Sequence, residues 1–183
     1  MVRYAFSTVG MTSIFTEAGV AQGVTVLKML PAKILRHERS ETGKVVVVVE
    51  YDTGKNNKLT RGWVVENPAE YEVGSSLKTP ALTQGQKLKI TGLSKGRGFQ
   101  DVMTIYHFGG GPASHGSRFH RNPGSIGMRT EPGRVTPGKK MPRRDGNEQI
   151  TLRNVKLAYW SEEETIAAIV GGVPGARGCT VFL

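Results

Sequence analysis

Most of the side chains that could contact a polyanion gather in one segment, from Lys95 to Arg144. This basic segment holds ten lysines and arginines but only two acids, Asp101 and Glu131, so it carries +8 of the chain's formal +10. Dense cations without matching carboxylates are typical of surfaces that neutralise phosphates, and rings among them can stack on unpaired bases. We therefore expect RNA to be bound by Lys95, Arg97, His115, Arg118, Phe119, His120, Arg121, Arg129, Arg134, Lys139, Lys140, Arg143 and Arg144.

Two glycine-rich stretches could bring the backbone close to RNA. Thr91–Phe99 places two cations among glycines, which favours a grip on phosphates by backbone amides and charge; a flexible hinge is the alternative. Gly109–Arg121 alternates small residues with rings and arginines. Its rings could stack on bases, or Phe108 and Phe119 could form a local cluster that stabilises the loop, and both could hold together.

The same residues support catalytic, metal and nucleotide chemistry poorly. His107, His115 and His120 are irregularly spaced, no cysteine lies near them, and nothing pairs them with an orienting carboxylate. Gly133–Lys140 approaches the phosphate-binding loop of nucleotide hydrolases, but a lysine stands where a magnesium-binding Ser or Thr is needed, and a proline removes one amide donor. The sequence therefore predicts no catalytic residue, no metal site and no cofactor.

Composition limits the class of protein further. The 183 residues, with a pI near 9.9, suffice for one domain with an appendage or for two small domains. A single cysteine, Cys179, excludes an intrachain disulfide framework. No apolar run approaches the ~20 residues of a transmembrane helix, and Met1–Phe15 lacks the apolar core of a signal peptide. We expect an intracellular protein with no membrane partner and no small-molecule substrate.

The basic segment cannot bury enough apolar surface to offset its ordering entropy, so other elements must position it. The residues on either side of it are typical of short strands joined by tight turns. A phase slip near Asn154 predicts a β-bulge, and the valine run suits a strand buried on both faces. A helix over Glu162–Val170, capped by Ser161, is the alternative to a turn and a strand there. The expected strands are Met11–Phe15, Val24–Leu30, Ala32–His37, Val45–Val49, Gln86–Ile90, Ile150–Tyr159, Ile166–Val170 and Cys179–Leu183.

Short strands at regular spacing favour a small barrel or sandwich. We therefore expect a mainly β fold with a long, irregular basic extension inserted into it. Residues 1–92 should form the first part of the β domain, residues 93–148 the insertion, and residues 149–183 the closing strands. Because both ends of such an insertion are anchored in the sheet, its tip could reach a defined place, unlike a basic tail.

The motifs of this chain, taken in order, resemble the signature of the L-three family of large-ribosomal-subunit proteins, and its bacterial or organellar branch most closely. Each motif alone is weak, but the set in this order is specific and spans nearly the whole chain. The matching stretches are Gly10–Thr12 with Phe15, Gly92–Phe99, Gly111–Ser117, His120–Gly127, Thr130–Val135, Gly138–Pro142 and Gly172–Gly175.

The resemblance implies a β-barrel of the translation-protein type and a structural, non-catalytic role in cytoplasmic ribosomes. It also implies that the extension threads through large-subunit rRNA towards the peptidyl-transferase centre, that binding occurs early in subunit assembly, and that neighbouring large-subunit proteins are partners. Two positions depart from the family pattern. Asp52–Arg61 is expected to be a short polar loop where members carry a longer stretch, and Gly111 stands where some bacterial members have a methylated Gln.

The residues alone leave two other functions open. An RNA-processing enzyme would use the histidines for acid–base work and would need a carboxylate beside His115 or His120, which the sequence lacks. A free-standing RNA-binding chaperone would act on many RNA molecules in turn, without stable incorporation into a particle.

Overall fold

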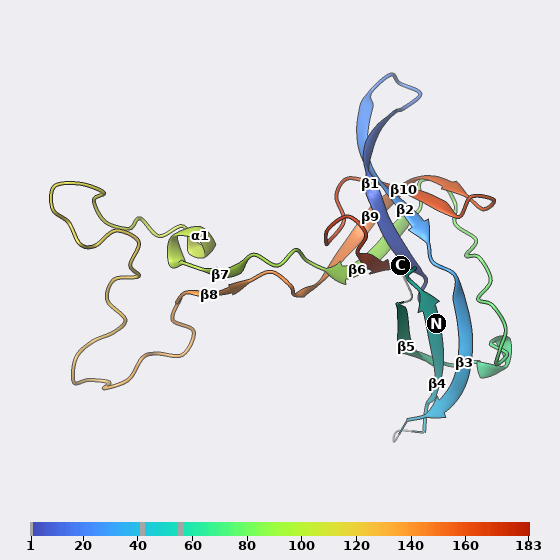
Figure 1. Cartoon of the computed structure of the whole chain (residues 1–183), viewed down its shortest axis with the longest axis horizontal. Coiled ribbons are helices and arrows are strands. Elements are labelled where there is room, and N and C mark those ends of the chain that lie inside the picture. Colours follow the sequence, from blue (N-terminus) through green and yellow to red (C-terminus); the bar gives the residue numbers. More distant parts are fainter. Residues whose placement is uncertain (1, 41–42, 55–56) are drawn as a thin grey trace. The chain divides into compact units, whose positions relative to one another are not determined.

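The computed structural model describes residues 2–40, 43–54 and 57–183, and its regular structure is mainly β (Figure 1). The β class expected from the sequence is confirmed. The chain divides into two compact units. The first, which we call the β unit, contains the residues up to Ser94 together with Gln149–Leu183; the second, which we call the extension, is Lys95–Glu148. Leu93 and Gln149 are direct register partners, so the chain leaves the β unit and returns to it at adjacent positions.

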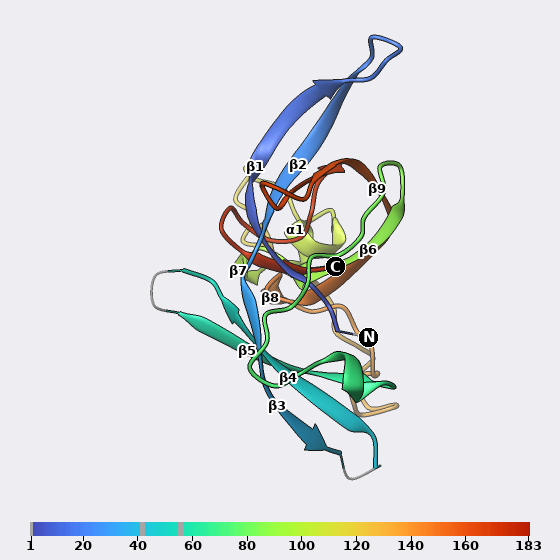
Figure 2. The same cartoon turned by 90° about the vertical axis from the view of Figure 1, so that its right-hand side faces the viewer.

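Six strands of the β unit close into a barrel (Figure 2). Their order is β1–β11–β6–β9–β10–β2, and β2 pairs with β1 to complete the ring. Alternation along each strand turns one side chain in two inward, and every barrel strand contributes to the interior. The strands are β1 (Ala5–Phe15), β2 (Ala21–Met29), β6 (Lys87–Leu93), β9 (Gln149–Ser161), β10 (Ile166–Val170) and β11 (Thr180–Phe182), and their interior residues include Phe6, Leu27, Ile90, Leu157, Ile169 and Val181.

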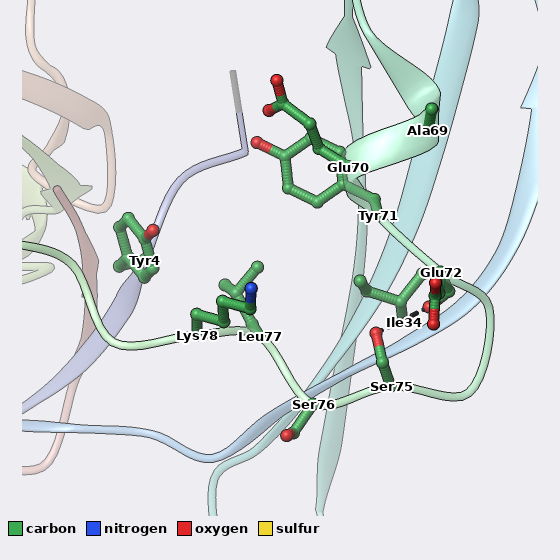
Figure 3. Close-up of a pocket in the computed structure, with 10 residues that line it drawn as sticks. All are labelled: Tyr4, Ile34, Ala69, Glu70, Tyr71, Glu72, Ser75, Ser76, Leu77 and Lys78. Carbon is green, nitrogen blue, oxygen red and sulfur yellow. Dashed lines mark hydrogen bonds between the residues drawn. The ribbon is translucent and has the colours of Figure 1, made fainter.

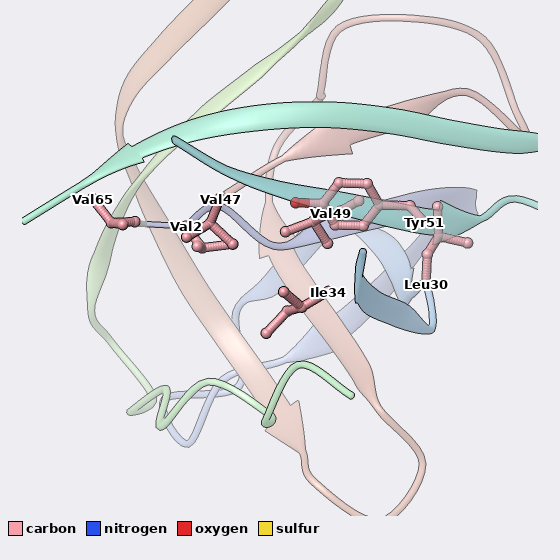
Figure 4. Close-up of a cluster of buried hydrophobic side chains, with 8 residues drawn as sticks. Val2, Leu30, Ile34, Val47, Val49, Tyr51 and Val65 are labelled. Carbon is pink, nitrogen blue, oxygen red and sulfur yellow. The ribbon is translucent and has the colours of Figure 1, made fainter. Parts of the chain in front are cut away.

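The remaining strands of the β unit form a separate antiparallel sheet, in the order β3 (Ala32–Arg39), β4 (Val45–Asp52) and β5 (Lys58–Val65). The valine run is therefore the central strand of this sheet and not a barrel strand. Its residues Val47–Val49 are buried, as expected for a strand covered on both faces, whereas Val45 and Val46 are half-buried. Val47, Val49 and Tyr51 lie on one face of β4 and pack with Ile34 and Val65 (Figure 4).

The expectation of a polar loop over Asp52–Arg61 is wrong, because β5 already begins at Lys58. Asp52 and Lys58 are register partners, so only five residues connect β4 to β5; positions 55 and 56 among them lie outside the described residues. Three apolar side chains at alternating positions, Leu59, Trp63 and Val65, pack against the core and hold β5 in the sheet despite its polar residues.

Two finer expectations are confirmed. The bulge near Asn154 is present: Leu88 pairs with Val155 and Ile90 with Leu152, which leaves one extra residue on β9, and Asn154 has a positive φ of 59°. The segment over Glu162–Val170 is a turn followed by strand β10, not a helix. The Ser161 hydroxyl accepts a hydrogen bond from the Glu164 N–H at 3.3 Å and so stabilises the turn.

A buried tyrosine joins the sheet to the first residues of the chain. Tyr51 is fully buried; its hydroxyl donates to the Arg3 carbonyl at 2.6 Å and accepts from Trp63 Nε1 at 2.8 Å. Burial, the largest effect, raises the pKa of Tyr51 to about 12. Because one hydroxyl bonds both groups, Tyr51 fixes the positions of the Arg3 backbone and the Trp63 ring, and its own ring fills part of the core.

Helices are few and short in the part of the chain that the structure describes. A single 3-10 turn, Pro68–Glu70, lies between β5 and β6, and α1 (Val102–Tyr106) lies in the extension. Neither is long and apolar enough to cross a membrane.

Candidate nucleic-acid interface

The extension has a small framework of its own. Strands β7 (Gly98–Gln100) and β8 (Arg143–Asp145) pair antiparallel and bring its two ends together. Helix α1 follows β7 at once, and the Asp101 carboxylate caps it by accepting a hydrogen bond from the Thr104 N–H at 2.8 Å. His107 ends the helix in the left-handed conformation, with φ of 58°. This framework places the long loops of the extension on a fixed base.

The extension lacks a hydrophobic core, as its composition predicted. Of residues 95–148, all of which the structure describes, only Val102 is buried, and residues 124–140 are exposed without interruption. Large apolar side chains stay open to solvent as well: 79% of Met128 and 71% of Phe99 are exposed. Since so little surface is buried within the extension, a bound partner would supply most of the contacts that hold its loops.

Backbone contacts close the loop that carries His115 and Phe119. The Gly111 N–H donates to the His120 carbonyl at 2.9 Å, and His120 Nδ1 lies 3.0 Å from the Pro112 carbonyl oxygen. A Cβ on residue 111 would lie 1.7 Å from the Phe119 carbonyl oxygen, so only glycine fits there. Any larger side chain at position 111 would require the Phe119 backbone to move.

Arg121 ties this loop to the start of α1. Its Nε donates to Asp101 Oδ2, and its Nη2 donates to the Thr104 hydroxyl at 3.3 Å. The hydrogen bonds from Arg121 and then from Thr104 hold the pKa of Asp101 well below its usual range. From the sequence, Arg121 was predicted only as an RNA contact, and its pairing with Asp101 was not predicted. An Asp three residues before a Thr N–H was the available signal for the helix cap.

The cations of the extension fall into two groups. Arg97 lies 3.4 Å from Asp145, Arg143 lies 3.1 Å from Glu148, and Lys140 lies 5.4 Å from the centre of the Tyr106 ring. These three cations and Arg121 form the first group, whose members have partners within the extension. The second group is exposed, and no ion-pair partner is found for it among the described residues; it consists of Lys95, Arg118, Arg129, Arg134, Lys139 and Arg144.

The ring side chains predicted to contact RNA are accessible. His115 and His120 are exposed, His115 adopts a positive φ of 61°, and 41% of Phe119 is exposed. Phe119 packs on the backbone of Gly111 and not on Phe108, whose ring partner is Tyr106 at 6.2 Å between centroids. The local cluster of Phe108 with Phe119, considered as an alternative from the sequence, is therefore replaced by two separate contacts.

Chemistry other than binding finds little support in the described residues. They contain no group of three or more His, Cys, Asp and Glu side chains placed to hold a metal. Gly133–Lys140 is an exposed turn with no strand directly before it and no helix after it, unlike a nucleotide-binding loop. The His120 imidazole contacts a backbone carbonyl, so it lacks the orienting carboxylate of an acid–base pair.

The β unit also contains a cavity of about 590 Å³ beside β3 (Figure 3). Tyr4 comes from the start of the chain, whereas Glu70, Tyr71, Glu72 and Lys78 come from the connection between β5 and β6. Two carboxylates against one lysine make this cavity unsuited to a phosphate group.

Comparison with known proteins places these features in a family. A sequence model described as Ribosomal protein L3 matches residues 21–169, which include the whole extension. A protein named large ribosomal subunit protein uL3 from Thermosipho africanus is 38% identical over 192 residues, covering 96% of this chain and 93% of that protein. Proteins of the same name from Thermotoga maritima and Kosmotoga olearia are 38% and 37% identical, each covered over 92% of its length.

Proposed function

The chain belongs to the ribosomal protein L3 family, and we propose that it is a structural protein of the large ribosomal subunit that binds rRNA directly, chiefly through the extension. The relatives named above are large-subunit proteins by name, and they align with nearly the full length of this chain.

One observation carries the proposal: six exposed cations without ion-pair partners stand on a segment in which one residue alone is buried. The extension contains ten lysines and arginines and four acids, Asp101, Glu131, Asp145 and Glu148, so its net charge is +6. The net charge of the extension therefore exceeds that of the larger β unit, which carries the remaining +4 of the total +10. Phosphates would neutralise these cations with release of counterions, and the bases could stack on Phe119 and the histidines.

Further parts of the proposal rest on the family resemblance. Residues 93–148 would act as the rRNA-penetrating insertion between the two parts of the barrel domain, residues 1–92 and 149–183. The insertion would run towards the peptidyl-transferase centre, the protein would join the subunit early in assembly, and its other partners would be neighbouring large-subunit proteins of cytoplasmic ribosomes. We propose no catalytic role, cofactor or metal.

Co-sedimentation tests the proposal. The tagged full-length chain is expressed in a bacterium, and the lysate is separated on a sucrose gradient after a high-salt wash. We expect the chain in the large-subunit fractions. Recovery only in the free-protein fractions would contradict incorporation and favour a free-standing RNA chaperone.

A further inference from the structure

We propose that a groove on the β unit binds an unpaired nucleotide of RNA, in addition to the contacts proposed for the extension. The groove has a volume of about 440 Å³ and lies between β5 of the sheet and barrel strands β6 and β11. We call it the Trp63 groove; its lining includes Arg3, Arg61, Trp63, Thr91, Gln149 and Phe182. The inference rests on the proposed function, since it assigns to the same RNA partner a second place of contact.

The charge of the Trp63 groove suits a phosphate. Two arginines line it, and none of its lining residues is acidic. Arg61 is exposed and has no ion-pair partner among the described residues. The Arg3 guanidinium contacts the Trp63 ring and lies 3.5 Å from the Thr91 hydroxyl, so its charge is positioned but not neutralised. Two guanidiniums with no carboxylate among the lining residues attract an anion, such as a phosphate, whose oxygen atoms can accept bidentate hydrogen bonds.

The rings of the groove are held in place before any ligand arrives. Trp63 Nε1 donates to the buried Tyr51 hydroxyl at 2.8 Å, and the Trp63 and Phe182 rings pack in a T-shaped arrangement, with centroids 5.4 Å apart and an interplanar angle of 65°. The Arg3 guanidinium carbon lies 5.3 Å from the Trp63 ring centre. Unpaired bases stack both on aromatic rings and on guanidinium planes, so this arrangement offers a preformed planar surface.

The combination of features selects the ligand class. An acidic peptide would satisfy the arginines but would leave the planar surface unused, whereas a nucleotide supplies a phosphate and a ring together. Gln149 and Thr180, which also line the groove, add amide and hydroxyl groups that can pair with the edge of a base. The cavity in Figure 3 contrasts with it, since two of its lining residues are glutamates.

Tryptophan fluorescence tests the groove directly. The chain has two tryptophans, so a Trp160→Phe variant of the full chain leaves Trp63 as the only reporter. The probe is a single-stranded oligouridylate, and its binding is followed in parallel by anisotropy of an end label. We expect saturable quenching of Trp63 with the same midpoint as the anisotropy change. Arg61→Ala should reduce the log–log salt slope of binding by about 0.7, the value for one phosphate contact; Arg39→Ala, an exposed arginine outside the groove, should not.

Ultraviolet cross-linking of the unmodified chain to the same oligouridylate provides a second measurement that needs no variant to fold. We expect cross-linked peptides that contain Trp63, Phe182 or Cys179. If the oligouridylate binds but cross-links only within residues 95–148, and Trp63 fluorescence stays constant, the groove inference is overturned while the proposed function stands. If no RNA binds at all, both fail. Quenching by a glutamate-rich peptide but not by oligouridylate would overturn the inference in favour of a protein partner.

Discussion

Single residues of the extension are held by backbone contacts more than by side-chain packing. The loop from Gly111 to His120 is closed by one N–H and one carbonyl, and the Phe119 carbonyl oxygen fills the space where residue 111 would carry a side chain. Loop shape in the extension therefore depends on which positions are glycine, because few buried apolar contacts are available to restore it.

Gly111→Ala should disrupt this loop without weakening the β unit. A Cβ would lie 1.7 Å from the Phe119 carbonyl oxygen and 2.6 Å from a Phe119 ring carbon, so the loop must open. We expect new protease cleavage between residues 111 and 120 and reduced incorporation into large subunits, with an unchanged urea midpoint. Gly109→Ala is the matched control, since nothing lies within 4 Å of its Cβ position. Equal behaviour of the two variants would show that loop closure has no part in assembly.

The sequence predicted accessibility of the site residues better than their pairing. All thirteen residues proposed to contact RNA are exposed, because a segment with this much charge and glycine cannot form a hydrophobic core. The partners of Arg97, Arg121 and Arg143 could not be predicted, because their acids lie up to 48 residues away along the chain and meet them only after folding. These three arginines form ion pairs within the extension, and we propose that they also bind RNA.

At the scale of elements, the junction between the three-stranded sheet and the barrel depends on Tyr51. Its hydroxyl serves both Arg3 and Trp63, and its ring meets Phe182 of β11 at 5.7 Å between centroids. The valine run predicted a strand buried on both faces, but it could not predict which element each face would meet.

Tyr51→Phe should destabilise the β unit by about 1–3 kcal/mol, because the Arg3 carbonyl and the Trp63 N–H lose their partner in a buried site. Urea unfolding followed by circular dichroism measures the change. Tyr159→Phe is the control, since 52% of Tyr159 is exposed. An equal, small effect of both substitutions would show that the buried hydroxyl contributes little to stability.

The same hydroxyl should make stability fall at high pH. Burial raises the pKa of Tyr51 from 10.0 to about 12, so the unfolded chain ionises first as the pH rises. The contribution is fully present below the unfolded pKa and is lost as the pH rises from about 10 to about 12. The difference in unfolding free energy between the wild type and Tyr51→Phe should therefore shrink between about pH 10 and about pH 12. A difference in unfolding free energy that stays constant over this pH range would contradict the raised pKa of Tyr51.

The elements were predicted where apolar residues recur with a period of two, and missed where that signal is short or diluted. Strand β5 carries the pattern in Leu59, Trp63 and Val65, but its lysine, arginine and glycine resemble a loop. Helix α1 has five residues, too few for a helical period to be visible. The division of the strands between a barrel and a separate sheet depends on long-range pairing, which no local pattern specifies.

At the scale of the whole molecule, a well-packed β unit and a coreless extension share one chain. Amide hydrogen exchange on the free protein should separate them, because protection follows burial and hydrogen bonding. We expect slow exchange at Ile90, Leu157 and Ile169 of the barrel interior and fast exchange throughout residues 124–140. Addition of large-subunit rRNA should slow exchange in that range. Strong protection of the extension in the free protein would show that it folds without a partner.

We propose that the cations of the extension without ion-pair partners bind rRNA phosphates, and the salt dependence of binding measures this directly. Affinity for large-subunit rRNA is measured across a salt series for the wild type and for the triple variant Arg118→Ala, Arg129→Ala and Arg134→Ala. The control replaces Arg39, Lys44 and Lys87, which are exposed on the β unit, by alanine. We predict that the extension variant reduces the log–log slope by about 2 to 3, from roughly 0.7 to 0.9 per phosphate contact, and that the control leaves it unchanged. A full slope in the extension variant, or its loss in the control, would contradict the claim.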